Sequence, residues 1–284
     1  KFNHFLPNAL FIKPLIEYLV SNPDALQISM ITFTIVEAVV GLFIILGLFT
    51  RLMSIGIFFL AMGILLGSGW IGTTCLDEWQ IGVLGVASGF VLFLTGSSTY
   101  SLDNYLKNKP YPFTEKKWFA FLGSGELPIK NLAPKVLVMS LIILGLTLFT
   151  NQYFHGGVLG TLHNKSVKPK VEISNIQHNG SQLTFQLFRV EGADVYGSFL
   201  IGIQVLDENN QVVKSIGQEE LASFPKEKIN NHYVAKIKSG KHSLIIPLGA
   251  KADITIDLEE ITPQNNYTLK LIDISGIEWI AEIR

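Results

Sequence analysis

The segment Gly69–Trp79 holds the residue types in this chain that are best suited to chemistry. It contains the only cysteine, two adjacent acids and two tryptophans, namely Cys75, Asp77, Glu78, Trp70 and Trp79. A thiolate can attack sulfur, and carboxylates can take up or release protons. Long apolar runs flank the segment, so these groups are expected where water, bilayer and a lipid-soluble electron carrier meet. The alternative interpretation is an interfacial loop with tryptophan anchors and solvated acids.

Cys75 has no basic residue close to it in the sequence. The neighbouring carboxylates disfavour a thiolate, so its activation would need a cation from elsewhere in the chain, such as a lysine or histidine of the outer domain. The alternative is a cysteine that only packs at the membrane boundary.

Glu37 is an acid in the middle of the apolar run Leu26–Thr50. An acid at mid-span costs about 2.5–3.5 kcal/mol on insertion scales, so it should face protein or water. The functional interpretation is a partner for a proton or a quinone headgroup. The structural alternative is a hydrogen bond between helices, to Thr32, Thr34 or Ser54.

Four apolar runs position these groups. The chain has 284 residues, of which 48% are hydrophobic and 16% charged, too apolar for an ordinary soluble domain. Each run is about long enough to cross a hydrocarbon core of roughly 30 Å as a helix; they are Leu26–Thr50, Leu52–Trp70, Ile81–Leu94 (extendable to Tyr100) and Val136–Phe154. Because the sequence starts at Lys1 without methionine, we also expect a further span before it.

Loop charges predict the orientation of the spans. The connection Ser101–Pro134 carries five lysines, and Arg51 follows the first run, whereas the loop Gly69–Trp79 has no lysine or arginine. The positive-inside rule then places Ser101–Pro134 in the cytoplasm and everything after Phe154 outside. We therefore expect a multi-pass protein of the inner (cytoplasmic) membrane with its C-terminal domain on the periplasmic or extracellular side.

From about Lys165 the pattern changes to short, often alternating runs separated by turn signals such as Asn179-Gly180 and Ser239-Gly240. The predicted strands include Val171–Ile176, Leu183–Val190, Tyr233–Ile237 and Ala252–Leu258. Eight or nine such strands favour an all-β, sandwich-like domain, with an immunoglobulin-like topology as one possibility. The predicted domains are thus a transmembrane helical bundle over residues 1–154 and an extracytoplasmic β domain over residues 155–284.

Positive groups near the membrane could hold an anion. The glycine-rich junction after Tyr153 carries His155 and His163, and the β domain could add Arg189, Lys236 and Lys251. The alternatives are a flexible linker and solvated surface lysines. The two histidines have no obvious third ligand, so no metal site is predicted.

Composition excludes several function classes. The net charge is −1 and no basic stripe is present, which excludes a nucleic-acid partner. A single cysteine excludes an internal disulfide framework and a cysteine-ligated iron–sulfur site, and no c-type haem motif is present. No flavin site is evident either. Redox chemistry would therefore use quinone, a partner's cofactor or Cys75 itself.

The motif Gly69-Trp70-x-Gly72-x-Thr74-Cys75-x-Asp77-Glu78-Trp79 resembles the DoxD membrane subunit of thiosulfate:quinone oxidoreductase. Glu37-x-x-x-Gly41 and Gly47-Leu48-Phe49-Thr50-Arg51 carry the same likeness. The second half is similar to the DoxA subunit at Leu162-His163-Asn164-x-Ser166, Arg189-Val190-Glu191-Gly192 and Pro247-Leu248-Gly249-Ala250-Lys251-Ala252. The whole chain thus resembles a fused DoxD–DoxA protein.

The resemblance implies an enzyme that joins two thiosulfates as tetrathionate and passes the electrons to membrane quinone. On this interpretation Cys75, Asp77 and Glu78 are catalytic, and Glu37, Trp70 and Trp79 bind quinone or handle protons. His163, Arg189, Lys236 and Lys251 would bind the substrate anion. The expected partners are thiosulfate, quinone, the lipid bilayer and a second copy or a respiratory protein.

Two other functions fit the same residues. One is a non-enzymatic, membrane-anchored subunit whose β domain binds an extracytoplasmic partner. The other is a transporter coupled to protons through Glu37, which is the weaker fit because the sequence shows no inverted repeat.

Overall fold

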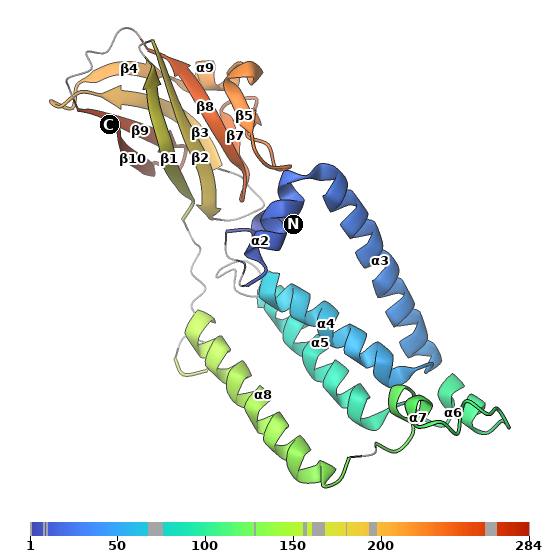
Figure 1. Cartoon of the computed structure of the whole chain (residues 1–284). Coiled ribbons are helices and arrows are strands. Elements are labelled where there is room, and N and C mark those ends of the chain that lie inside the picture. Colours follow the sequence, from blue (N-terminus) through green and yellow to red (C-terminus); the bar gives the residue numbers. More distant parts are fainter. Residues whose placement is uncertain are drawn as a thin grey trace. The chain divides into compact units, whose positions relative to one another are not determined.

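The computed structural model separates the chain into two compact units, Ala25–Asn164 and the combination of Lys1–Asp24 with Lys165–Arg284. We call them the helical unit and the β unit (Figure 1). The structure describes residues 2–7, 9, 11–67, 76–127, 129–155, 158–160, 168–179, 181–192, 198–258 and 266–283. Trp70, Cys75 and His163 lie outside these residues, and of Asp77, Glu78 and Trp79 only the backbone is described.

Long apolar helices make up most of the helical unit: α3 (Pro23–Leu46), α4 (Thr50–Gly67), α5 (Leu76–Thr95) and α8 (Leu132–His155). Within the described residues, three helical stretches are long and apolar enough to cross a membrane, Pro23–Leu46, Thr50–Gly67 and Leu132–Tyr153. The apolar part of α5 is shorter, at Gln80–Thr95. The three long stretches correspond to three of the four predicted spans.

Small residues allow α4 and α5 to pack closely. A Cβ atom on Gly85 would lie 2.6 Å from the Cβ of Ala61, and one on Gly89 would lie 2.9 Å from the carbonyl oxygen of Ser54. Neither distance is compatible with a larger side chain unless the helices move apart. The Gly85-x-x-x-Gly89 pattern is therefore a packing feature, as small residues at helix contacts in membranes usually are.

Two buried charged side chains, Arg51 and Asp103, lie at the end of the helical unit that carries the short helices α6 (Leu102–Lys107) and α7 (Lys117–Leu122). Arg51 is 3% exposed and donates from Nε to the Phe93 carbonyl and from a terminal nitrogen to the Ala120 carbonyl, both at 2.8 Å. The carboxylate of Asp103 accepts from the backbone N–H of Phe49 at 2.7 Å and of Thr50 at 3.1 Å. Asp103 thereby satisfies amides at the start of α4 that the helix itself leaves unpaired.

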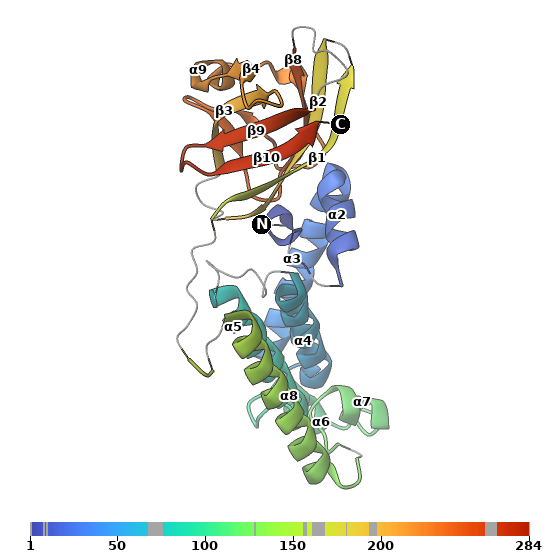
Figure 2. The same ribbon diagram turned by 90° about the vertical axis from the view of Figure 1, so that its left-hand side faces the viewer.

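The β unit contains two antiparallel sheets. The four-stranded sheet has the order β1 (Lys170–Asn179), β2 (Gln182–Glu191), β8 (Lys251–Asp257), β5 (Ile229–Asn231). The six-stranded sheet, whose β9 and β10 face the viewer in Figure 2, runs β10 (Glu278–Ile283), β9 (Tyr267–Asp273), β3 (Ser198–Leu206), β7 (Leu244–Ile246), β6 (Lys238–Ser239), with β4 (Val212–Ile216) also paired to β3. The helix α9 (Gln218–Ala222) and a 3₁₀ turn, Lys226–Lys228, connect β4 to β5.

Alternating side chains from both sheets form one apolar core. Leu183, Phe185 and Leu187 of β2 and Ile254 of β8 belong to the same buried cluster as Leu269 of β9, and all five are fully buried. This alternation is the one predicted for strands with one wet face. The C-terminal half is therefore rich in β-sheet, as predicted.

The predicted strand Tyr233–Ile237 is wrong. The structure has a bend there, because the side chain of Asn231 bonds the backbone of Ile237 twice. Its Oδ1 accepts from the Ile237 N–H at 2.7 Å, and its Nδ2 donates to the Ile237 carbonyl at 3.1 Å. Such side-chain bonds to nearby backbone compete with a strand ladder. The bend allows the side chain of Tyr233 to pack against the N-terminal segment.

The first residues pack against the strands of the β unit, although the predicted domain division places them with the helical part. They form α1 (Phe2–Phe5) and α2 (Lys13–Ser21). Leu6, Ile16 and Val20 share a buried cluster with Tyr233, and the Val234 N–H donates to the Val20 carbonyl at 3.0 Å. The spatial units thus differ from the predicted division into 1–154 and 155–284, which follows the order of the sequence.

Candidate functional site

The outer face of the four-stranded sheet carries a row of side chains that differ in character from the apolar inner face. β2 and β8 are antiparallel neighbours, and their register places three pairs on this face. We call these residues the outer-face strip: Thr184 with Thr255, Gln186 with Asp253, and Phe188 with Lys251. Since side chains alternate along a strand, the same register sends Phe185 and Ile254 into the core.

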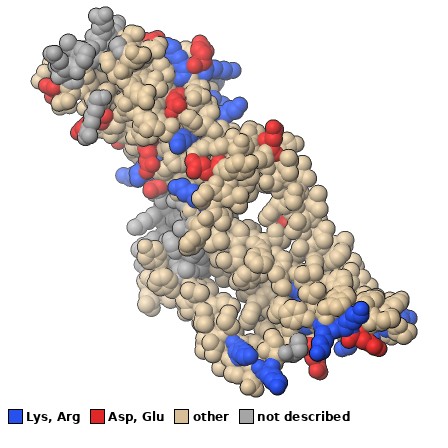
Figure 3. Space-filling model, viewed as in Figure 1, with Lys and Arg blue, Asp and Glu red and all other residues tan. Residues whose placement is uncertain are grey.

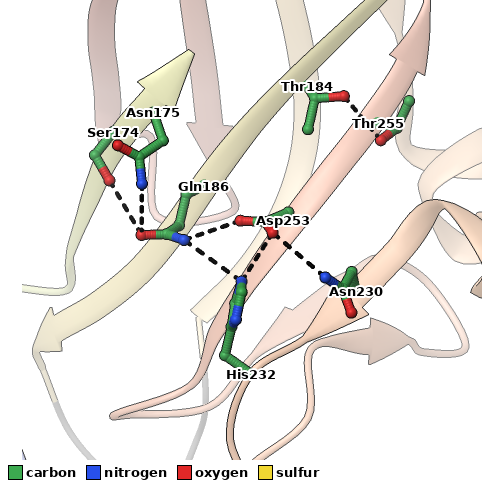
Figure 4. A network of polar contacts seen from close by, with 8 residues as sticks. All are labelled: Ser174, Asn175, Thr184, Gln186, Asn230, His232, Asp253 and Thr255. Carbon is green, nitrogen blue, oxygen red and sulfur yellow. Dashed lines mark hydrogen bonds and ion pairs between the residues drawn. The ribbon is translucent and has the colours of Figure 1, made fainter. Parts of the chain in front are cut away.

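Asp253 is the centre of a polar network (Figure 4). Its Oδ2 lies 2.8 Å from Nε2 of His232 and accepts from Nδ2 of Asn230 at 3.4 Å, while its Oδ1 accepts from Nε2 of Gln186 at 2.9 Å. His232 follows β5, and its backbone N–H donates to the Lys251 carbonyl at 2.9 Å, which fixes the ring beside β8. A single carboxylate therefore holds three side chains in place.

The network defines the tautomer of His232. Its Nε2 is 2.8 Å from the carboxylate of Asp253 but 3.4 Å from the amide nitrogen of Gln186, which is itself a donor. The short contact to an acceptor places the proton on Nε2, directed at Asp253. Nδ1 is then the ring nitrogen that can accept a proton from a ligand, and the side chain is 35% exposed. This is the arrangement of a histidine oriented by a carboxylate.

Opposing effects set the charge of Asp253. Burial by itself raises the pKa of this carboxyl. Hydrogen bonds from Gln186, His232 and Asn230 outweigh burial and hold the pKa of Asp253 below its usual value. The carboxylate is therefore ionised at neutral pH and serves as an acceptor.

Gln186 is 8% exposed and is held from its other side by β1. Its Oε1 accepts from Nδ2 of Asn175 at 3.3 Å and lies 3.5 Å from Oγ of Ser174 (Figure 4). Asn175 has a φ of 48°, at a point where the pairing of β1 with β2 shifts register between Ser174 and Gln177. This irregularity turns the Asn175 amide toward Gln186.

Lys251 lies over two aromatic rings at one end of the strip. Its ammonium nitrogen is 5.8 Å from the ring centroids of both Phe188 and Tyr233, within the range of a cation–π contact. The hydroxyl of Tyr233 donates to Oε1 of Glu17 in α2 at 2.6 Å. Burial, followed by this hydrogen bond, raises the pKa of Tyr233, so the phenol stays neutral and keeps donating.

Arg189 occupies a different position from the other cations of the predicted anion site. It is 1% exposed, and its guanidinium donates to the carbonyls of Glu191 at 3.3 Å and Ile246 at 3.1 Å. A guanidinium that is buried against carbonyl oxygens ties strands together and has little surface to offer an anion. Lys236, in contrast, is exposed in the bend after β5.

Glu37 is exposed on α3. Two of its suggested hydrogen-bond partners donate to backbone carbonyls instead, Thr34 to Met30 at 2.9 Å and Ser54 to Arg51 at 2.7 Å. Asp77, Glu78 and Trp79 lie in the first turn of α5, directly after Cys75 in the sequence.

A cavity of about 520 Å³ in the helical unit is lined by Ser97, Asp103, Lys107 and Ser124, among others. The Ser124 hydroxyl donates to Asp103 at 2.7 Å. Because this carboxylate already accepts the amides at the start of α4, we assign it to holding the turn between α3 and α4.

Among the predicted site residues whose side chains the structure describes, Lys251 lies in a cluster of side chains on the sheet surface. Its neighbours Gln186, His232 and Asp253 were missed. The alternation Ala252–Leu258 could have indicated that Asp253 shares a face with Lys251. Nothing in the sequence pairs β8 with Gln186, which is 67 residues away from Asp253.

Two solved structures show a weak likeness to this chain. They are the archaellum periplasmic stator protein complex FlaF and FlaG and the archaellum periplasmic stator protein FlaG, both from Sulfolobus acidocaldarius. Each match has 13% sequence identity and a TM-score of 0.26. The first covers 43% of this chain and 96% of the matched chain, and the second covers 40% and 99%. At this TM-score the likeness carries no argument.

Two family models match the chain in succession. Residues 1–130 match the model described as TQO small subunit DoxD, and residues 154–282 match the model described as TQO small subunit DoxA. Together they cover nearly the whole sequence, which confirms the resemblance read from the motifs. The chain thus matches the DoxD family over its first part and the DoxA family over its second, in the order of a fused DoxD–DoxA protein.

Proposed function

We propose that this protein is a membrane oxidoreductase that oxidises thiosulfate to tetrathionate and passes the electrons to membrane quinone. The observation that carries the proposal is the succession of both TQO small-subunit families in one chain. The long apolar helices α3, α4 and α8 support it, because they would bring the protein into contact with a lipid-soluble acceptor. In the overall reaction two thiosulfates lose one electron each as an S–S bond forms, and quinone takes up two electrons and two protons.

The substrate is a small dianion, which needs positive groups on a water-accessible surface. We propose Lys251, Lys236 and His163 for this role. Lys251 is held over Phe188 and Tyr233, so less side-chain freedom is lost when its ammonium binds an anion. We leave Arg189 out because its guanidinium is buried against carbonyl oxygens.

In the first proposed route, Cys75 forms a covalent adduct. An S–S bond forms between its thiolate sulfur and the outer sulfur of thiosulfate, and the two electrons released pass to quinone. A second thiosulfate then attacks that outer sulfur, which releases tetrathionate and restores the thiolate. Asp77 and Glu78 are proposed to deliver the two protons that the reduced quinone takes up.

In the second proposed route, quinone itself is the centre of attack. One thiosulfate adds to the quinone ring through its outer sulfur, and a second thiosulfate attacks that sulfur to form tetrathionate and leave hydroquinone. Glu37, Trp79 and Trp70 would then bind the quinone, with an acid supplying the two protons. In this route Cys75 makes no covalent bond.

The β unit also supports a membrane topology. Lys1–Asp24 and Lys165–Arg284 form one compact unit. We propose that this unit lies on one side of the bilayer, so that the chain between its two parts crosses the bilayer an even number of times. Three described helices qualify by length, so we propose α5 as the fourth. Its 20 residues extend about 30 Å, the thickness of a hydrocarbon core.

The same topology places α6 and α7 on the opposite side of the membrane from the β unit. Figure 3 shows Lys and Arg side chains gathered at the end of the helical unit that carries these two helices. By the positive-inside rule that end is cytoplasmic. The β unit is then periplasmic or extracellular.

The test is turnover by the purified chain in detergent, with thiosulfate as donor and a short-chain quinone as acceptor. We expect quinone reduction that depends on thiosulfate. The variant Cys75→Ala separates the routes, since it abolishes turnover in the first and preserves it in the second. Lys251→Gln should raise the KM for thiosulfate, whereas Lys228→Gln, which alters a lysine paired with Asp257, should not. Absence of turnover in the unmodified chain would instead favour the anchoring role.

A further inference from the structure

The helix α2 has two apolar faces, but the β unit covers only one of them. Ile16 is 1% exposed and Val20 is fully buried, and both pack in the cluster that contains Tyr233. On the other side Leu15 is 58% and Tyr18 is 59% exposed. A helix that is apolar on two faces needs a partner for each.

Phe11 extends this second face. It lies two residues before the first residue of α2, whereas Leu15 and Tyr18 are three residues apart within the helix and therefore share one face. The side chain of Phe11 is 90% exposed. Its backbone has a φ of 55°, which is a strained conformation for a bulky residue. The local structure thus holds an aromatic ring away from the β unit. We call Phe11, Leu15 and Tyr18 the exposed row.

The exposed row is followed closely in the sequence by a long apolar helix. α2 ends at Ser21, and α3, which is long and apolar enough to span a membrane, begins at Pro23. Tyr18 is therefore within five residues of a membrane-spanning helix. Phenylalanine, leucine and tyrosine are side chains that segments lying in the membrane interface use to contact lipid.

We propose that the exposed row inserts into the headgroup and acyl-chain boundary of the bilayer, so that α2 seats the β unit on the membrane surface. The occupant of this face is lipid, continuous with the lipid that surrounds α3. α2 would then be a wedge with lipid on one side and the β unit on the other.

The geometry within the β unit gives a consequence. Tyr233 contacts α2 through Glu17 and lies beside Lys251. A helix with its side chains is about 10–12 Å thick. The Lys251 end of the outer-face strip would thus lie about one helix thickness from the lipid. Membrane insertion of the row is independent of the proposed enzymatic activity.

The test is site-directed spin labelling of the whole chain in lipid nanodiscs. Single cysteines replace Phe11, Leu15 or Tyr18 in a Cys75→Ser background, which leaves one labelling site in each protein. Power saturation then compares collisions with oxygen, which concentrates in lipid, and with a water-soluble nickel chelate. A label at Val213, which is 47% exposed on β4 of the same unit, is the matched control.

We expect oxygen accessibility to exceed nickel accessibility at all three row positions, and the reverse at Val213. The ratio of the two should differ several-fold between row and control. Nickel accessibility at the row equal to that at Val213 would overturn the proposal, because the face would then be in water. Low accessibility to both reagents would also overturn it, because protein, such as a second copy, would then cover the row. None of these readouts uses catalytic turnover.

Discussion

The docking of the N-terminal segment on the β unit depends on Gly249. This residue has a φ of 72°, and a Cβ atom on it would lie 1.7 Å from the carbonyl oxygen of Asn3. The Gly249 N–H donates to the Arg189 carbonyl at 2.9 Å, which holds the turn in this conformation. The substitution Gly249→Ala therefore adds a methyl group where the N-terminal segment now lies.

The effect has two parts. A left-handed backbone costs an alanine about 1–2 kcal/mol. Ordinary contact with a Cβ begins at 3.4 Å, so the backbone of Asn3 would also have to retreat by well over an ångström. Overpacking of this kind typically costs about 1–3 kcal/mol. Since the retreat also separates Leu6 from the cluster with Tyr233, we expect the segment to detach locally while the core of the β unit stays folded.

Gly276→Ala is the matched control. Gly276 has a similar φ of 80°, but a Cβ there would meet no atom within 4 Å among the described residues. It therefore carries the backbone strain without the clash. The difference between the two variants measures the contact with Asn3.

Hydrogen exchange read by mass spectrometry on the whole chain is the assay. In Gly249→Ala the amides of α1 and α2 should exchange faster by at least tenfold, which corresponds to about 1.4 kcal/mol. The amides of β2 and β8 should change little. Equal exchange of α1 and α2 in Gly249→Ala and Gly276→Ala would refute the docking of this segment at Gly249.

Three further predictions concern polar contacts. Tyr233→Phe removes the hydrogen bond to Glu17, which is exposed, so α2 should lose only about 1 kcal/mol of docking, or roughly fivefold in exchange. Because the folded pKa of Tyr233 is raised above the usual value of a tyrosine, near 10, this stabilisation is full below about pH 10 and disappears at higher pH, which the mobility of a spin label at Lys13 would report. Asp103→Asn weakens bonds to the start of α4 and should lower the thermal midpoint of the chain in detergent by an amount equivalent to about 1.5–3 kcal/mol. Because the pKa of Asp253 is lowered on folding, its carboxylate stabilises the fold at a pH above its unfolded pKa, and this stabilisation is lost as the pH falls through the folded pKa. In Asp253→Asn the free energy of unfolding should therefore fall less steeply as the pH is lowered.

Local patterns predicted the elements of this fold well. The apolar runs became α3, α4, α5 and α8, and alternation found the long strands of the β unit. These signals are local, since helix and strand periodicity can be read within a dozen residues. The strand expected at Tyr233–Ile237 failed because two side-chain bonds from Asn231 outweigh the strand preference of the segment.

The sequence did not predict the contacts between residues that are far apart along the chain. The contact between the first segment and Tyr233 joins residues 216 positions apart. The outer-face strip could not be predicted for the same reason, because it depends on the register of β2 against β8. The buried position of Arg189 also follows from the carbonyls of Glu191 and Ile246, which only the folded chain brings together.

The proposed function is tested most directly by the stoichiometry of the reaction. Purified chain is incubated without oxygen with thiosulfate and a short-chain quinone, and tetrathionate and quinol are quantified in the same sample. We predict one tetrathionate formed for each quinol, with both products absent when either substrate is omitted. Quinol formed without tetrathionate, or neither product from a folded chain, would contradict the assignment as a thiosulfate:quinone oxidoreductase.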